Sequence, residues 1–164
     1  MPIDAFAAVA QRYCEFIDQW IADTAPHPYT TLLQTLSELS ITALQLPLTN
    51  PDRVHDKLDA YNTTKPWKEI STEIERLTFP AVMDLVERHP EQDPGTHAAI
   101  MLFDDLSDVY LELKSGLYAY HSTLEDATEV ACWHWRFNYE IHWGEHLYRA
   151  LLTVHEIRYQ LRLD

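Results

Sequence analysis

Residues 98–120 have the sequence AAIMLFDDLSDVYLELKSGLYAY, in which apolar side chains recur every three or four positions. This spacing predicts an amphipathic α-helix over Ala98–Tyr120, because an α-helix has about 3.6 residues per turn. Thr123 and Asp126 then form the pattern of a capping box, which opens the next helix. The predicted buried stripe of the first helix consists of Leu102, Leu106, Val109, Leu113, Leu117 and Tyr120.

The rest of the chain keeps the same helical period and is interrupted mainly by prolines. Only three glycines occur in 164 residues, which disfavours tight β-hairpins and excludes a glycine-rich phosphate loop. The sequence therefore predicts a single all-α domain over residues 1–164, an irregular bundle of roughly six to eight helices. The further expected elements are helices over Asp4–Asp23, Thr30–Leu46 and Glu125–Ile141 (continuing to about Leu161), a short helix after Asn50, and a break or kink at Pro80.

Acidic side chains outnumber basic ones by 26 to 12, which gives a formal net charge of −14. We therefore expect neither nucleic acid nor a membrane as partner, because anionic phosphates would be repelled. No apolar run is long enough to span a bilayer, and Asp4 stands where a signal peptide would carry a base. The expected location is the cytoplasm, where Cys14 and Cys132 would stay reduced.

An acidic string, Asp104-Asp105-Leu106-Ser107-Asp108, lies within the predicted helix over Ala98–Tyr120. Carboxylates at this spacing can hold Mg²⁺ against a diphosphate, as they do in all-α isoprenoid synthases. This chain is too short to enclose the apolar cavity of such an enzyme. The favoured interpretation is a solvated or arginine-paired acidic line.

The acidic line runs through Asp104, Asp108 and Glu112, each four residues from the next. The helix that follows should lie antiparallel to it, because the connection between them is short. We therefore expect this line to approach arginines of the C-terminal segment, chiefly Arg136 or Arg149.

A second metal hypothesis pairs Asp84 and Glu87 with Asp105 and Asp108, two carboxylate pairs on consecutive helices. This arrangement resembles the Mg²⁺ sites of all-α nucleotide pyrophosphohydrolases. Those enzymes favour glutamate at most of these positions, whereas three of the four residues here are aspartate.

A third hypothesis rests on His142-Trp143-Gly144-Glu145-His146, which matches the H-x-x-E-H order of inverted zinc peptidases. Two histidines four residues apart share a helix face and can bind Zn²⁺ while the glutamate acts as base. Gly144 counts against this, because glycine weakens the helix that must fix the ligand angles. We expect His142 and His146 not to bind zinc.

A helical projection of residues 130–161 separates two sides. The expected core side carries Trp133, Phe137, Ile141, Tyr148 and Leu151, with His155 among them. The opposite side carries Trp135, Tyr139, His142 and His146. Aromatic rings on a polar side favour a covered or partner-facing surface over solvent exposure.

The same residues carry a family resemblance. Asp104-Asp105-Leu106-Ser107-Asp108-Val109-Tyr110, followed by Leu113-Lys114 and Gly116-Leu117, resembles a block of the bacterial family called domain of unknown function 5063. Trp135-Arg136-Phe137, Glu140, His142-Trp143-Gly144, His146 and Leu151 resemble a second block, and Leu44 to Pro47 a weaker one. The resemblance implies a bacterial, cytosolic, all-helical protein and brings no activity with it.

The leading functional hypothesis is a non-enzymatic module that binds another protein or a small ligand, without a cofactor. Its candidate surface consists of Trp135, Tyr139, His142, His146, Asp104, Asp105, Asp108, Glu112 and Arg136. The alternative is a metal-dependent hydrolase, with Mg²⁺ at Asp104, Asp105 and Asp108 or Zn²⁺ at His142, Glu145 and His146. No nucleophile–base motif such as G-x-S-x-G is present, which favours the binding module. The sequence does not specify an oligomeric state.

Overall fold

Helices dominate the computed structural model, which describes residues 1–24, 28–49, 67–93, 95, 97–123 and 125–163, and none of these residues lies in a β-strand. A short 3₁₀ turn, Ala98–Met101, leads into α5, and a π turn, Tyr139–Trp143, joins α6 to α7 without a break. The α-helices are α1 (Pro2–Ile21), α2 (Pro28–Ala43), α4 (Trp67–Glu87), α5 (Leu102–Tyr120), α6 (Ala127–Asn138) and α7 (Gly144–Leu161).

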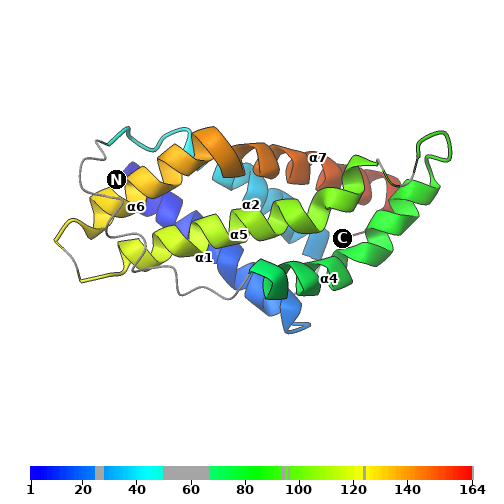
Figure 1. Cartoon of the computed structure of the whole chain (residues 1–164), viewed down its shortest axis with the longest axis horizontal. Coiled ribbons are helices and arrows are strands. Elements are labelled where there is room, and N and C mark those ends of the chain that lie inside the picture. The colour runs from blue at the N-terminus through cyan, green and yellow to red at the C-terminus, as the bar shows by residue number, and fades with distance from the viewer. Residues whose placement is uncertain (25–27, 50–66, 94, 96, 124, 164) are drawn as a thin grey trace.

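The described residues form five long helical rods, fewer than the six to eight expected for the whole chain, because the two helices expected on either side of Pro80 are one helix. Pro80 lies inside α4, which continues through it and changes direction along its length (Figure 1). The segment from Ala127 to Leu161 is one rod in which α6, the π turn and α7 follow one another. The short helix predicted after Asn50 lies outside the described residues.

Helix α5 occupies the middle of the bundle and packs against α1, α4, α6 and α7 (Figure 1). Its predicted stripe is confirmed, since Leu102, Leu106, Val109 and Leu113 are each fully buried. The predicted stripes of α1 and α2 are buried in the same core. Within the described residues, no helix is long and apolar enough to cross a membrane.

The predicted core side of the α6–α7 rod is wrong for its middle part, although Trp133 is buried and Leu151 packs against the core. Phe137, Ile141 and Tyr148 are 42%, 64% and 50% exposed, whereas Trp135 and Trp143 are fully buried. The buried residues Trp135, Tyr139, Trp143 and Leu147 follow one another at intervals of four. Such a row drifts around a regular α-helix, but a π turn contains more residues per turn and keeps the row on one side. A uniform helical projection misses this shift.

Two glycines permit close approaches in this half of the molecule. A Cβ atom at Gly116 would lie 2.0 Å from the indole Nε1 of Trp135, so α5 and α6 can pack this closely only around glycine. A Cβ atom at Gly144 would lie 2.3 Å from the carbonyl oxygen of Tyr139. Gly144 directly follows the π turn as the first residue of α7 and does not end the helix, contrary to the weak point expected there.

Candidate metal centre

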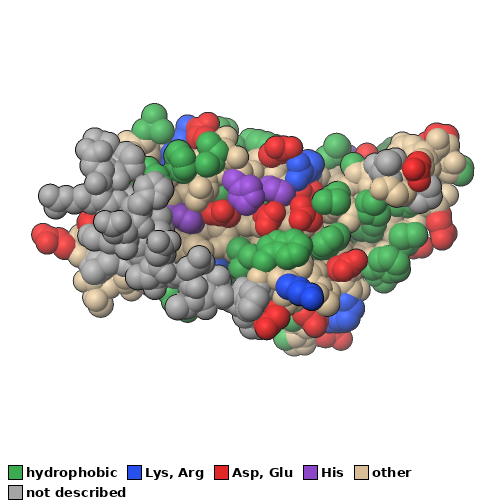
Figure 2. Space-filling model, in the orientation of Figure 1, with side chains coloured by type: hydrophobic (Ala, Val, Ile, Leu, Met, Phe, Trp, Pro, Cys, Tyr) green, Lys and Arg blue, Asp and Glu red, His purple; other side chains and the backbone are tan. Residues whose placement is uncertain are grey.

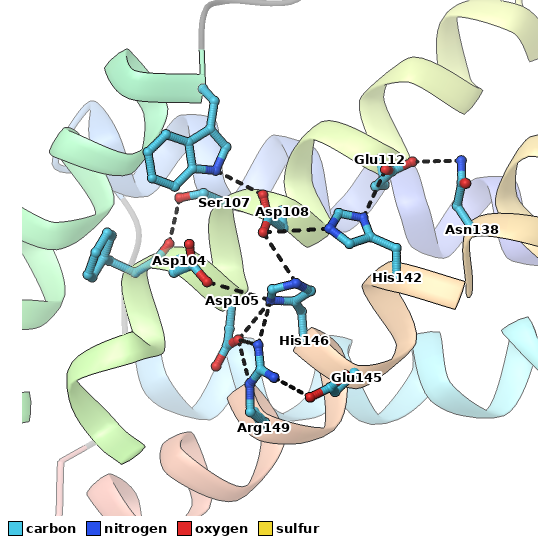
Figure 3. Close-up of polar contacts among 12 residues, drawn as sticks. Asp104, Asp105, Ser107, Asp108, Glu112, Asn138, His142, Glu145, His146 and Arg149 are labelled. Carbon is cyan, nitrogen blue, oxygen red and sulfur yellow. Dashed lines mark hydrogen bonds and ion pairs between the residues drawn. The ribbon is translucent and has the colours of Figure 1, made fainter. Parts of the chain in front are cut away.

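Two rows of polar side chains face each other between α5 and the α6–α7 rod (Figure 3). The acidic row on α5 consists of Asp104, Asp108 and Glu112, and the facing row consists of His134, Asn138, His142 and His146. Both rows have a four-residue spacing, and the helices run antiparallel, so each acid meets its partner in order. Histidines and acids gather at the surface over this seam (Figure 2).

The two rows converge on Asp108. Its Oδ2 lies 3.3 Å from the Nε2 of His146 and 3.9 Å from the Nε2 of His142. One ligand atom from each of these three residues lies within 4.8 Å of the others. Tetrahedral zinc with bonds of about 2.0–2.1 Å places its ligand atoms about 3.3–3.5 Å apart. The three side chains therefore need only small movements to share one ion.

In both His142 and His146, the Nδ1 atom, which is the ring nitrogen not directed at Asp108, lies next to a separate carboxylate. The Nδ1 of His142 lies 3.1 Å from the Oε1 of Glu112, and the Nδ1 of His146 lies 2.9 Å from the Oδ1 of Asp105. A metal-ligating histidine usually donates its other ring N–H to such a group, which fixes the tautomer and ring orientation. The Nδ1 of His146 also lies 2.9 Å from the Nη2 of Arg149, a group that can only donate. The contacts at Nδ1 therefore position both rings with Nε2 toward Asp108, and the tautomer is specified by a carboxylate alone only at His142.

Trp67, the first residue of α4, holds the third side chain. Its indole N–H donates to the Oδ1 of Asp108 at 2.8 Å, which leaves Oδ2 directed at the histidines (Figure 3). Trp67 is 41% exposed, so it lies on the side of the cluster that is open to solvent.

Asp105 and Arg149 close the inner end of the cluster. The guanidinium donates to the Oδ1 of Asp105 from Nε at 2.9 Å and from Nη2 at 2.6 Å, and the Asp105 side chain is only 1% exposed. Burial raises the pKa of Asp105, although hydrogen bonds from Arg149 and His146 oppose that shift. The hydrogen bond to Asp105 in turn raises the pKa of Arg149.

Glu112 anchors the other end of the seam. It accepts from Asn138 at 3.0 Å, and its carboxylate oxygens lie 3.1 Å from the Nε2 of His134 and 3.1 Å from the Nδ1 of His142. Burial by itself would raise the pKa of this carboxyl, but the two histidines outweigh burial and leave the pKa below its usual value. Glu112 is therefore an anion that orients its neighbours.

The structure separates the residues of the acidic string. Its aspartates divide between two groups of potential metal ligands, whose ligand atoms lie within 4.8 Å of one another: Asp108 lies with His142 and His146, and Asp104 and Asp105 lie with His146. Asp105 is also paired with Arg149, so the three aspartates of the string do not share one group. The acid that pairs with arginine is Asp105, which follows Asp104 in the sequence and is not part of the predicted row. The charge of Asp104 acts on Arg149, but the ion pair with that guanidinium belongs to Asp105.

Of the two arginines expected near the acidic row, Arg149 lies there and Arg136 pairs elsewhere. Arg136 forms an ion pair with Glu140 at 2.5 Å and donates to the carbonyl oxygens of Ala43 and Leu44. Trp135 and Tyr139 lie in the core, the covered alternative of the predicted surface.

The remaining motif residues lie outside the cluster. Glu145 is 78% exposed and pairs with Arg149, so it is not directed at the histidines. Asp84 and Glu87 are exposed and belong to neither group of potential metal ligands found among the described residues. The pyrophosphohydrolase-like pairing of four carboxylates is therefore absent from the described part of the chain.

Replacing Arg149 should destabilise the fold, because Asp105 would remain as a buried carboxylate without its guanidinium partner. We expect Arg149→Met to lower the free energy of unfolding by about 3 kcal/mol, measured by guanidinium chloride denaturation at pH 7. The double variant Asp105→Asn with Arg149→Met should recover part of this loss, because no buried charge remains. An unchanged denaturation midpoint in Arg149→Met would contradict this account.

These features define the protein as an all-helical bundle with a histidine–carboxylate cluster between α5 and the α6–α7 rod. The family model for the domain of unknown function 5063 matches residues 2–160, and the chain belongs to that family. The match extends well beyond residues 103–151, where the sequence resemblance is best.

A solved structure has the same fold. Protein BF1032 from Bacteroides fragilis superimposes with a TM-score of 0.70 at 14% sequence identity, over 97% of this chain and 93% of that one. At this identity the likeness concerns the fold alone. No curated protein sequence matches this chain.

Proposed function

We propose that this protein binds one divalent transition-metal ion through Asp108, His142 and His146. The observation that carries the proposal is the convergence of both Nε2 atoms on one carboxylate oxygen while each Nδ1 meets a separate carboxylate. Purely structural ion pairs do not need both features. Two imidazoles and one carboxylate are the donors of many zinc and non-haem iron sites.

The donor set also indicates which ions fit. Imidazole suits Zn²⁺, Fe²⁺, Co²⁺ and Ni²⁺, whereas Mg²⁺ and Ca²⁺ prefer oxygen ligands. Mg²⁺ is thus a poorer match to these side chains than Zn²⁺. This proposal names the ligand class of a small-ligand-binding module and takes two of its ligands from the H-x-x-E-H motif. It therefore replaces the expectation from the sequence that His142 and His146 do not bind zinc.

Calorimetric titration of metal-free protein with Zn²⁺ tests the proposal. We expect one equivalent to bind, and we expect Glu112→Gln to weaken binding by about 10–100-fold through the lost support of His142. Glu145→Gln is the matched control, because this exposed motif glutamate faces Arg149, and its affinity should equal that of the wild type. Absence of saturable binding to the wild type would refute the proposal, and a loss of affinity in Glu145→Gln would favour the peptidase-like ligand set.

Hydrolysis is a second candidate function, favoured by the number of ligands. Three protein ligands leave coordination positions for water and substrate, as in catalytic zinc sites. The cluster combines one arginine with four acids, so phosphate-rich substrates would be repelled and neutral or cationic ones favoured. The four acids are Asp104, Asp105, Asp108 and Glu112. Assaying Zn²⁺-loaded protein on a neutral ester and on a phosphate monoester tests this candidate, which requires turnover of the neutral ester.

A further inference from the structure

A cationic pocket lies at the far end of α7, away from the metal centre. It is an open cavity of about 740 Å³ between the C-terminal ends of α4 and α7. Arg158 is twelve residues beyond His146, which corresponds to about 18 Å along a helix. The lining residues are Arg88, His155, Arg158, Tyr159, Gln160 and Arg162.

The charge of this pocket is opposite to that of the whole protein. Among the residues that the structure describes, six line this pocket, of which three are arginines and none is an acid, in a chain with a net charge of −14. Among the described residues, no ion pair with a carboxylate is found for Arg88 or Arg162. Such pairs are made elsewhere by Arg12, Arg76, Lys114, Arg136 and Arg149.

Helix ends explain only part of this arrangement. Cations are favoured near the C-terminus of a helix, where the macrodipole is negative, and that effect acts on each arginine separately. It does not require side chains from two helices to line one cavity. It also gives no reason for the neutral polar groups there, Gln160, which lies 3.2 Å from the Nε2 of His89, and the parallel rings of His155 and Tyr159.

Arg162 has an unusual backbone for its residue type. It follows the last residue of α7 with φ 55° and ψ 38°, the left-handed conformation that glycine adopts most easily. An L-residue with a Cβ atom is less stable there than glycine. Glycine at this position would relieve the backbone but would remove a guanidinium from the pocket.

We infer that this pocket binds a small, multiply charged oxyanion, held by Arg88 and Arg162 with Arg158. Guanidinium groups present paired N–H donors that match the oxygens of a phosphate or carboxylate group. The site is independent of the metal centre, because it shares no residue with it.

Titration calorimetry on metal-free protein tests the inference with two probes, inorganic pyrophosphate and citrate. We expect saturable binding of at least one probe, and the probe that binds identifies a phosphate or a polycarboxylate as the ligand type. Arg88→Gln and Arg162→Gly should each weaken it by at least about 10-fold, the scale of one lost charge-assisted contact. Arg76→Gln is the control on α4, because Arg76 is paired with Glu73 outside the pocket, and its binding should be unchanged.

Arg162→Gly gives a second readout that separates binding from folding. Without anion, this variant should melt about 2–4 °C above the wild type, because the backbone strain is relieved. With saturating anion, only the wild type should gain further stability. Failure of both probes to bind, or equal binding by the arginine variants and the wild type, would overturn the inference.

Discussion

Replacing Trp135 by alanine should be among the most destabilising single changes in this protein. The indole is fully buried, lies 4.9 Å from the ring of Phe6, and donates to the carbonyl oxygen of Leu113 at 3.3 Å. Removing a buried tryptophan costs about 3–5 kcal/mol, through lost apolar contact and the cavity that remains. The expected result is a guanidinium chloride midpoint far below that of the wild type.

Phe79→Ala supplies the control for this prediction. Phe79 lies on α4 and is 55% exposed, so its truncation should lower the free energy of unfolding by less than about 1 kcal/mol. If the two variants unfolded at similar denaturant concentrations, Trp135 would not contribute the large share of the folding free energy that its burial indicates. Gly116→Ala should lie between them, because its new Cβ atom would push against the Trp135 ring.

The second large effect concerns the proposed metal ligands. Replacing His142 and His146 together by alanine should abolish binding of Zn²⁺, because only the Asp108 carboxylate would remain of the three ligands. The loss should exceed the roughly 10–100-fold that follows from altering an outer partner such as Glu112. Binding of Co²⁺, followed by its visible absorption, should disappear in the same variant.

His121→Ala is the control for this experiment. His121 is exposed, follows the last residue of α5, and is in neither group of potential metal ligands, so its variant should bind Zn²⁺ like the wild type. Circular dichroism should show that the double histidine variant remains helical, so that lost binding is not lost folding. Unchanged Zn²⁺ affinity in a folded double variant would show that His142 and His146 are not metal ligands and would contradict the proposed site.

The sequence predicts the all-α class well, because the helical spacing of apolar residues can be recognised within each short segment. The stripe from Leu102 to Leu117 spans one helix, and each of its residues is informative without knowledge of the rest of the fold. The orientation of the α6–α7 rod was not predictable in the same way. Both of its sides carry aromatic rings, and the π turn at Tyr139–Trp143 shifts the helical phase between its two halves.

The candidate site was predictable only in part. The H-x-x-E-H motif points to two of the three proposed ligands, His142 and His146, but it suggests Glu145 where the geometry favours Asp108. Two rows with a four-residue spacing on antiparallel neighbours could have indicated that Asp108 faces these histidines. Trp67 could not have been found, because it is 41 residues from Asp108 and meets it only through the packing of α4 on α5.

Anomalous diffraction from crystals grown with one equivalent of Zn²⁺, measured on both sides of the zinc absorption edge, tests the metal site most directly. We expect one peak on the seam between α5 and the α6–α7 rod, about 2.0–2.2 Å from the Nε2 atoms of His142 and His146 and from a carboxylate oxygen of Asp108. A peak at other residues, or none at this position in protein saturated with Zn²⁺, would contradict the proposed site.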